Sequence, residues 1–363
     1  MTSLLQADCD AALEQTGPGV WEALRSSRIL LTGGTGFVGS WLLELLLRAN
    51  DVLDLQVGLV VLTRDPVAFR RKSPRLASAQ AIDLHTGDIK WPFRLAGSFD
   101  YIIHAATEAN ADLNAREPRL VFDTIVDGTR HILEVAAASR CRRFLLVSSG
   151  AVYGRQPPDL ELTPETFLGA PDPTSPQAAY GEGKRAAELL SVLGAAHGGF
   201  ESTIARCFAF VGPYLPLDRH FAIGNFIHDA MAGGPVLVRG DGTAIRSYLY
   251  ASDLAVWLLT ILTLGIPGRP YNVGSADAIT INNLAQTVAD VIDPRVSITI
   301  VGAGTGGTAN AVDRYVPNIG RARRELDLHS TVTLADAIKR TERWYKGNRP
   351  SGFGRKKVTF VSR

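Results

Sequence analysis

The sequence predicts an α/β fold: a doubly wound parallel sheet with helices on both faces, and a smaller α/β substrate lobe towards the C-terminus. Short apolar runs of β type alternate with segments of helical spacing in the first half of the chain, which is typical of βαβ units. A glycine-rich turn follows the first of these runs. The 363 residues are enough for one large core with an attached lobe.

The first element is an apolar strand at 29–31 that leads into the glycine-rich turn. Gly33, Gly36 and Gly39 have the spacing GxxGxxG, and an apolar segment with helical spacing follows at 41–47. In such a strand–turn–helix unit, glycines let backbone N–H groups and the positive end of the helix approach a pyrophosphate. A glycine turn without a ligand is the alternative, but the flanking strand and helix argue against it. We therefore expect a dinucleotide to bind here.

The second strand, at 57–62, ends at residues that bear on the choice of cofactor. An acidic side chain at this point binds the ribose 2′-hydroxyl of NAD, whereas an arginine accommodates the 2′-phosphate of NADP. Arg64 and Asp65 are both present, and Asp65 has the alternative role of capping the helix that Pro66 opens. Because Arg64 comes first and three more basic side chains follow at 70–72, the sequence favours NADP over NAD.

The third and fourth strands end at residues that suit the rest of a dinucleotide. The third strand, in the segment 82–89, is expected to end at Asp88, whose carboxylate is placed to accept a hydrogen bond from an adenine amino group. A turn aspartate is the alternative. The fourth strand, at 101–106, is very apolar, as expected for a strand buried on both faces of a parallel sheet. Ala105 and Ala106 at its end leave room for a ribose.

The next elements place hydroxyl and amine side chains near the same edge of the sheet. Residues 118–138 have the spacing of an amphipathic helix, and the fifth strand, at 144–149, ends in two serines. Ligands of open α/β sheets bind at that end of the strands. A further helix is expected to begin after Ser175 as its N-cap. Tyr180 and Lys184 are four residues apart, so they share one face of it.

Tyr180 and Lys184 suit the transfer of a proton to or from a sugar hydroxyl. A phenol has a pKa near about 10, so it needs a positive charge close by to act near neutral pH. A unit charge about 4 Å away contributes roughly 4 kcal/mol at an effective dielectric constant near ~20, so Lys184 and an oxidised nicotinamide are expected to lower the pKa of Tyr180 by roughly three units. Ser149 would hold the substrate oxygen beside the phenol.

In this combination and order, the motifs resemble the extended short-chain dehydrogenase/reductase family, and in particular its epimerase/dehydratase group, which acts on nucleotide sugars. The resemblance covers roughly residues 28–340 and rests on TGGTGFVG at 32–39, GDI at 87–89, HAA at 104–106, SSGAVYG at 148–154, YGEGK at 180–184, ARCFAFVGP at 205–213, GNFI at 224–227, GDGTAIRSYLYASDLA at 240–255 and YNVGS at 271–275.

The resemblance implies a Rossmann domain and a set of site residues. The catalytic residues would be Ser149, Tyr180 and Lys184. Asn225 and Arg246 would contact the nucleotide diphosphate of the substrate; an arginine is also what a diphosphate requires physically, and a surface ion pair is the alternative for Arg246. The cofactor contacts would be Gly33, Gly36, Phe37, Val38, Gly39, Arg64, Asp88, Ile89, Ala105, Ala106 and, near the nicotinamide, Phe208.

Two positions depart from the family pattern. Dehydratases that remove water across C5 and C6, and sugar-acid decarboxylases in part, carry acidic residues directly after the catalytic hydroxyl, where this chain has Gly150 and Ala151. Neither can move a proton. Ile125 stands where the family often has asparagine, so we expect the polar network behind Lys184 to be rebuilt.

The expected function is therefore NAD(P)-dependent oxidoreduction at C4 of a nucleotide-linked sugar, by a 4-ketoreductase or a C4 epimerase. A 4,6-dehydratase or sugar-acid decarboxylase of the same family is the alternative. A non-catalytic, dinucleotide-sensing regulator is an alternative of another class, because fold alone does not determine function. Such a regulator would have no need of Tyr180 and Lys184.

The overall composition excludes several other classes of protein. Hydrophobic residues make up 46% of the chain, charged residues 20%, and the net charge is +2, so nothing points to nucleic acid as a partner. Cys9, Cys141 and Cys207 are far apart and form no metal-binding or disulfide pattern. His104, in an apolar strand, is interpreted as a core residue. With no signal peptide or membrane-length apolar run, we expect a cytoplasmic protein without a metal.

The expected organisation has four parts. Residues 1–27 would form an N-terminal arm or helix, 28–205 the dinucleotide-binding domain with a later contribution from about 245–275, 206–347 mainly the substrate-binding lobe, and 348–363 a mobile basic tail. The helices at 118–138 and 175–193 have apolar or small residues on more than one face. In the family that this chain resembles, two subunits pair these helices into a four-helix bundle, so a homodimer is expected.

Overall fold

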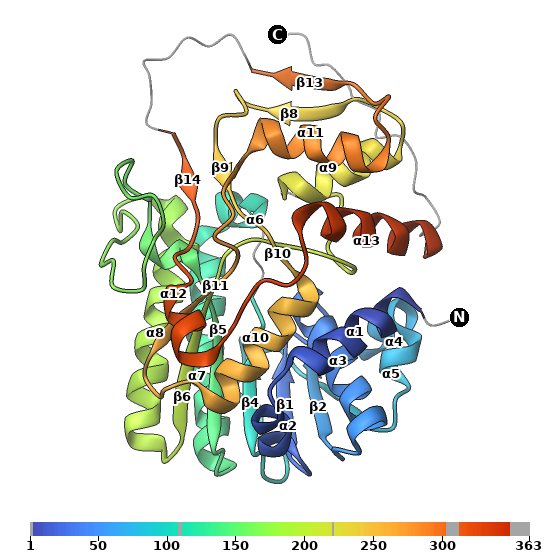
Figure 1. Ribbon diagram of the computed structural model, residues 1–363. Helices are drawn as coiled ribbons and strands as arrows, with labels where there is room; N and C mark the ends of the chain where they lie inside the picture. Colours follow the sequence, from blue (N-terminus) through green and yellow to red (C-terminus); the bar gives the residue numbers. More distant parts are fainter. Residues whose placement is uncertain (1–2, 108–110, 220, 303–311, 349–363) are drawn as a thin grey trace.

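A computed structural model describes residues 3–107, 111–219, 221–302 and 312–348. A seven-stranded sheet lies at its centre (Figure 1), and each neighbouring pair of its strands is parallel. From one edge to the other the strands are β11 (Pro270–Val273), β6 (Glu201–Cys207), β5 (Arg143–Ser149), β4 (Tyr101–His104), β1 (Arg28–Thr32), β2 (Gly58–Thr63) and β3 (Ile82–Thr86). The order reverses between β1 and β4, where ligands of doubly wound sheets bind. The predicted fold class is confirmed.

Helices cover both faces of the sheet because its strands are apolar on both sides. Ile29 and Leu31 pack in one core with α3 (Phe37–Leu53) and α10 (Ala251–Leu264). Leu30 points the other way, into a second core with α7 (Pro118–Ala138) and α8 (Ala179–Gly198). This alternation follows from the two-residue period of a strand, and it explains why the sequence shows continuous apolar runs at these strands.

The N-terminal arm consists of α1 (Leu4–Gln15) and α2 (Pro18–Leu24), and both helices pack on α10. Trp21 and Leu24 are buried. Asp8 of α1 is also buried: its carboxylate accepts hydrogen bonds from the Tyr250 hydroxyl at 2.5 Å and from an Arg340 nitrogen at 2.6 Å. A buried carboxylate needs such partners, so the arm is joined to two elements from the far end of the chain.

The lobe lies above the carboxyl ends of the strands in Figure 1. Its core brings together α9 (Ala222–Met231), α11 (Ile281–Ile292), α13 (Leu334–Gly347) and the parallel pair β8 (Val236–Arg239) and β13 (Ile298–Val301). A three-stranded sheet links the lobe to the large sheet; β9 (Ile245–Arg246) is its central strand, between β12 (Ile279–Thr280) and β14 (Arg314–Tyr315).

The remaining elements are short connections. They are α4 (Pro66–Lys72), α5 (Pro74–Ala77), α6 (Ala111–Arg116), the 3-10 turns η1 (Gly150–Tyr153) and η2 (Pro176–Ala178), β7 (Phe210–Val211), β10 (Leu249–Tyr250) and α12 (Gly320–Leu326). Within the described residues, no helix is both long enough and apolar enough to cross a membrane. The predicted tail at 348–363 lies outside the described residues except for Asn348, which follows α13.

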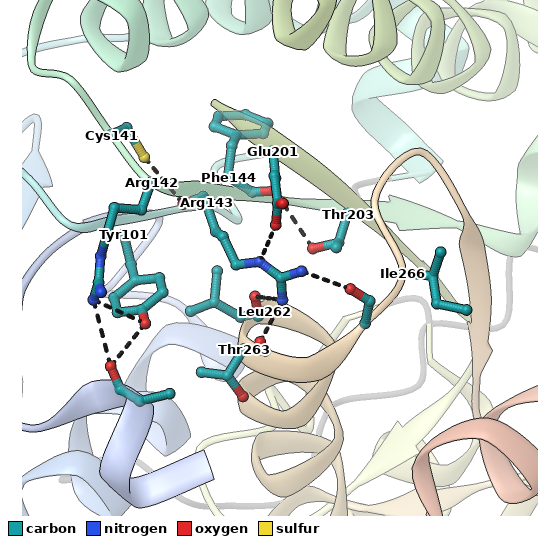
Figure 2. A network of polar contacts seen from close by, with 12 residues as sticks. Tyr101, Cys141, Arg142, Arg143, Phe144, Glu201, Thr203, Leu262, Thr263 and Ile266 are labelled. Carbon is teal, nitrogen blue, oxygen red and sulfur yellow. Dashed lines mark hydrogen bonds and ion pairs between the residues drawn. The ribbon is translucent and has the colours of Figure 1, made fainter. Parts of the chain in front are cut away.

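At the amino ends of the strands, on the side of the sheet away from the lobe, one arginine connects several elements (Figure 2). Arg143 donates hydrogen bonds to the carbonyl oxygens of Leu262 and Thr263 in the last turn of α10 and to Gly265 beyond it, and its Nε lies 2.6 Å from Glu201. The last carbonyl groups of a helix lack partners within the helix, and a cation there also complements the helix dipole. Arg143 therefore joins α10 to β5.

Two predicted boundaries are wrong for local reasons. The third strand ends at Thr86 rather than Asp88, because its ladder with β2 closes at Thr86 and the following Gly87 N–H donates the last bond to Thr63. The helix expected after Ser175 begins as the 3-10 turn η2, and α8 starts only at Ala179. The Ser175 hydroxyl donates to the Gln177 side chain and does not cap the helix.

Candidate active site

The glycine turn is packed so closely that side chains are excluded from it. Gly33 has a φ of +72°, and a Cβ there would lie 2.7 Å from the carbonyl group of Ala105 and the nitrogen of Ala106. A Cβ on Gly39 would lie 2.4 Å from the Gly33 carbonyl oxygen. The turn therefore joins the ends of β1 and β4 to the first turn of α3, and the fold itself requires glycine at positions 33 and 39.

The N-terminus of α3 is free to bind an anion. Gly36 is its N-cap and supplies no side-chain cap, so the first N–H groups of this 17-residue helix have no side-chain acceptor there. Phe37 and Val38 in the first turn pack on the core below. Unpaired N–H groups and the helix dipole suit a phosphate group. The residues present at this turn thus fit the pyrophosphate of a dinucleotide.

The end of β2 is positively charged. Asp65 caps α4, since its carboxylate accepts a hydrogen bond from the Ala68 N–H at 2.8 Å; this is the structural role that the sequence left open for it. Arg64 beside it is exposed. The Lys72 ammonium lies 3.1 Å from the carbonyl oxygen of Thr35 in the glycine turn, and burial lowers the pKa of Lys72. Arg64 and Lys72 therefore flank the position where an adenosine ribose would follow from the pyrophosphate.

Asp88 and Ile89 take structural roles in the loop after β3. The Asp88 carboxylate accepts a hydrogen bond from the Lys90 N–H at 3.0 Å, which makes it the turn aspartate that was the alternative; its contact to adenine stays a prediction. Ile89 is buried and lies against Gly128 of α7, and its carbonyl oxygen lies 2.7 Å from His131 Nδ1.

His104 is a core residue, as interpreted from the sequence. Its ring lies 2.8 Å from the Thr32 hydroxyl through Nδ1 and 3.4 Å from the Thr129 hydroxyl through Nε2. Burial, and the positive charge of Lys184, lower the pKa of His104 to about 3. A neutral histidine with a hydroxyl on each side connects β1, β4 and α7 and has no free nitrogen for catalysis.

A cavity of about 1700 Å³ lies between the carboxyl ends of the strands and the lobe. Five of the predicted site residues line it, and they come from five different parts of the fold: Ser149, Tyr180, Phe208, Asn225 and Arg246. The glycine turn, Arg64, Asp88, Ala105 and Ala106 do not line this cavity. Among the described residues, no three His, Cys, Asp or Glu side chains are grouped as metal ligands.

Lys184 lies behind the cavity wall with only 3% of its surface exposed. Its ammonium donates hydrogen bonds to the Thr107 hydroxyl and to the Val147 carbonyl oxygen, both at 2.8 Å. Burial lowers the pKa of Lys184 to about 8. Ile125, where the family often has asparagine, packs on Gly183 next to it. Thr107 and Val147 thus form the polar surroundings of Lys184.

Tyr180 does not have the lowered pKa that the sequence led us to expect from Lys184. Burial raises the pKa of Tyr180 to about 12, with the nearby Ser149 hydroxyl acting in the opposite direction. The ammonium of Lys184 is held by Thr107 and Val147 instead. The Ser149 oxygen accepts a hydrogen bond from the Ala151 N–H at 3.1 Å, and the same hydroxyl interacts with the phenols of Tyr180 and Tyr315.

Arg246 and Asn225 lie across the cavity, in the lobe. The Arg246 guanidinium pairs with the Asp313 carboxylate at 2.6 Å and bonds the carbonyl oxygens of Ile245 and Asp313. The ion pair that was the alternative for Arg246 is therefore present, although Arg246 still lines the cavity. The Asn225 amide donates to the Arg219 carbonyl oxygen at 2.7 Å.

Two further residues at this site, Thr107 and Tyr315, could not be predicted from motifs in the sequence. Thr107, which holds Lys184, follows directly after the HAA segment and carried no signal of its own. Tyr315 lines the cavity and reaches the catalytic end from β14. Tyr315 is brought to the site by the pairing of β14 with β9, which joins residues far apart in the sequence, and by the hydrogen bonds of the neighbouring Val316 with Gln156 and Thr163.

Comparison with known proteins points to one family. The model of the family described as "NAD dependent epimerase/dehydratase family" matches residues 29–274. UDP-glucuronic acid decarboxylase 1 of Arabidopsis thaliana is 31% identical over 313 residues, which cover 86% of this chain and 68% of that protein.

Solved structures are similar along most of the chain. A dTDP-glucose 4,6-dehydratase from Streptomyces venezuelae, crystallised with NAD, is 27% identical with a TM-score of 0.75, and the match covers 89% of this chain and 98% of that one. A UDP-glucose 4-epimerase from Thermotoga maritima shares the fold with a TM-score of 0.73 at 21% identity, over 88% of this chain and 99% of that one. The likeness includes both the sheet and the lobe.

Proposed function

Because the chain belongs to the NAD-dependent epimerase/dehydratase family of enzymes, we propose that it carries out NAD(P)-dependent oxidoreduction at C4 of a nucleotide-linked sugar, as a 4-ketoreductase or a C4 epimerase. The observation that carries the proposal is the cavity itself: Ser149 and Tyr180 line one end and Arg246 lines the lobe side. The names of the relatives, which refer to UDP- and dTDP-linked sugars, support a nucleotide sugar as the substrate.

The residues would divide the work as follows. A bound nicotinamide supplies or accepts the hydride at C4. The Tyr180 hydroxyl gives its proton to the C4 oxygen during reduction and takes it back during oxidation. Ser149 would donate a hydrogen bond to the same oxygen and hold it beside the phenol. For oxidation, the oxidised nicotinamide would add the positive charge that favours the tyrosinate, because Lys184, one helical turn away on α8, does not by itself lower the pKa of Tyr180.

The cofactor and the substrate would bind on different parts of the chain. Gly33, Gly36 and the N-terminus of α3 would hold the pyrophosphate of the cofactor, with Arg64 favouring NADP over NAD. Asn225 and Arg246 in the lobe would hold the diphosphate of the substrate, for which Arg246 must exchange part of its contact with Asp313. The boundary between the two binding regions would fall near residue 205.

Dehydration is disfavoured by the residues next to Ser149. Removing water across C5 and C6 requires a base for the C5 proton and an acid for the C6 hydroxyl, each within hydrogen-bond reach. Gly150 and Ala151 supply neither group. We therefore expect no 4-keto-6-deoxy product from a nucleotide-linked glucose.

Decarboxylation is the second candidate, favoured by the 31% identity to a UDP-glucuronic acid decarboxylase. Once C4 of a uronic acid is a ketone, the C5–C6 bond can break as CO₂ leaves, and the electron pair passes to the C4 carbonyl. This step needs the oxidation at C4 but no acid at position 150. Gly150 thus disfavours dehydration more strongly than it disfavours decarboxylation.

One set of incubations tests these functions. The purified protein is given a preformed 4-keto sugar nucleotide with NADPH or NADH, and UDP-glucose, dTDP-glucose or UDP-glucuronic acid with the oxidised cofactors. We expect the 4-keto sugar to oxidise the reduced cofactor, or UDP-glucose to yield its C4 epimer. Release of CO₂ from UDP-glucuronic acid would favour the decarboxylase instead, and a 4-keto-6-deoxy product at catalytic rates would return the chain to the dehydratases.

Two tyrosine variants separate an enzyme from a cofactor-sensing regulator. Tyr180→Phe should lose turnover and keep cofactor affinity. Tyr153→Phe is the matched control, because the Tyr153 hydroxyl bonds Asn272 at 2.8 Å and its side chain does not line the cavity. Full turnover in Tyr180→Phe would contradict the proposed role of this phenol.

We also propose a homodimer and a reducing, cytoplasmic location. Four apolar side chains are exposed on α7 and α8, the helices expected to pair: Leu120, Leu189, Val192 and Leu193. The three cysteines are buried and unpaired, which fits a compartment in which thiols stay reduced.

A further inference from the structure

The space beside Gly150 is filled by two aromatic rings. A Cβ built on Gly150 would lie 2.7 Å from the Tyr315 hydroxyl oxygen and 2.7 Å from Cζ of Phe208. The two rings also contact each other, with centroids 4.6 Å apart. No side chain can therefore be added at position 150 unless Tyr315 and Phe208 move. At the position that follows Ser149, this chain has a phenol from β14 in place of an acid from its own loop.

The Tyr315 hydroxyl is available to a ligand. It interacts with the Ser149 side chain, and its distance of 3.4 Å from the Cys207 carbonyl oxygen is long for a hydroxyl donor, whose usual distance is about 2.7–2.8 Å. Tyr315 is only half-buried and lines the cavity together with Ser149 and Tyr180. Burial raises the pKa of Tyr315, so the phenol keeps its proton and acts as a donor rather than as a base.

The strand pairing places Tyr315 next to the expected diphosphate site. Tyr315 and Arg246 are register partners on the parallel strands β14 and β9, so they extend from the same face of this small sheet about 4.8 Å apart at the backbone. A sugar whose diphosphate contacts Arg246 and whose C4 oxygen lies at Ser149 must pass Tyr315. The phenol is therefore beside the sugar ring and remote from the nucleotide base.

We propose that Tyr315 is a specificity residue whose hydroxyl donates a hydrogen bond to the sugar of the bound nucleotide sugar. This inference rests on the proposed function, because it needs a sugar at Ser149. In this site Gly150 and Tyr315 act as a pair. The glycine leaves room for the phenol of Tyr315. That phenol lies where dehydratases have an acid, and it binds the substrate without transferring a proton.

The test compares ligands with and without the sugar. Binding of UDP, UDP-glucose, dTDP and dTDP-glucose is measured by calorimetry for the wild type and for Tyr315→Phe. We expect the variant to lose about three- to tenfold in affinity for the nucleotide sugar, as one hydrogen bond to a neutral group predicts, and to bind the bare nucleotide and the cofactor as the wild type does. Its kcat/KM should fall by a similar factor, with the pH profile unchanged because Tyr315 does not titrate in the working range.

Tyr153→Phe is the control for a structural effect. Its ring lies 6.3 Å from that of Phe208, but its hydroxyl bonds Asn272 outside the cavity, so it should lower Tm without changing the ratio of sugar nucleotide to nucleotide affinity. An unchanged ratio in Tyr315→Phe, with a wild type that binds the sugar nucleotide, would overturn the inference and leave the proposed function standing. A wild type that binds none of the four ligands would overturn both.

Discussion

The Lys184 ammonium nitrogen lies 2.8 Å from the Thr107 hydroxyl oxygen, and this contact holds a charged group that is almost fully enclosed. Thr107→Val keeps the shape of the side chain and removes the hydroxyl. A buried ammonium that loses a partner destabilises the fold by about 1–3 kcal/mol, so we expect a lower Tm together with lower activity. Thr124→Val is the matched control, since the Thr124 hydroxyl bonds only its own helix, at Leu120. Equal losses in both variants would contradict this role for Thr107.

The histidine between Thr32 and Thr129 should make the protein sensitive to acid. The folded-state pKa of His104 is about 3 against an ordinary value of 6.5, so between these values the unfolded chain binds a proton that the folded protein does not. Stability that His104 contributes is therefore present above pH 6.5 and is lost as the pH falls.

The expected loss from His104 is about 1.6 kcal/mol between pH 6.5 and pH 5, because the slope rises from half of its full value at pH 6.5 towards about 1.36 kcal/mol per pH unit. Urea unfolding gives the free energy of unfolding at both pH values. The fall in this free energy between the two pH values should be larger for the wild type than for His104→Asn. The same substitution at His197, which is exposed on α8, serves as the control. If His104→Asn loses as much stability in acid as the wild type does, His104 is not the group responsible.

Arg64 and Asp65 offer a direct test of cofactor choice. If Arg64 faces the adenosine ribose, charge-assisted bonds to a 2′-phosphate contribute about 1.5–3 kcal/mol each, so Arg64→Ala should weaken NADPH by about ten- to a hundredfold and NADH little. Asp65→Ala should lower stability by about 0.5–2 kcal/mol through loss of the α4 cap and leave the ratio of the two affinities unchanged. If the wild type prefers NADH and Asp65→Ala reduces that preference, Asp65 is the residue that binds the ribose 2′-hydroxyl.

The exposed face of α8 predicts how the protein assembles. Leu189 is 60% exposed and Leu193 49%, and these two side chains are one turn apart on the same face of the helix. Leu189→Glu with Leu193→Glu should convert a dimer into a monomer in light scattering at micromolar concentration, because charges cannot be buried unpaired in an apolar interface. Val52→Glu, at an exposed position of α3, should leave the dimer intact. A monomeric wild type would contradict the prediction.

Local patterns were enough to predict much of the fold and of the site. The helix at 118–138 begins and ends where its apolar spacing predicts, and the strand–turn–helix reading of the glycine turn is confirmed by β1 and α3. Ser149 and Tyr180 were expected near each other because β5 ends and α8 begins at one edge of the sheet, and both line the cavity.

What the sequence could not predict depends on distant contacts. Tyr315 lies against Gly150 through long-range contacts that include the pairing of two-residue strands, which are too short to leave a period in the sequence. The raised pKa of Tyr180 follows from burial, and spacing along a helix says nothing about how deeply a side chain is enclosed. The early end of β3 depends on where its ladder with β2 closes.

The contact between Asp8 and Arg340 also bears on how the chain is made. Proteins generally begin to fold from the N-terminus during synthesis, but the enclosed carboxylate of α1 gains its cationic partner only after a further 332 residues have been added. Until then, docking α1 on α10 would bury the carboxylate without a cationic partner. We therefore expect α1 to settle only after α13 has been synthesised, although α1 comes much earlier in the sequence.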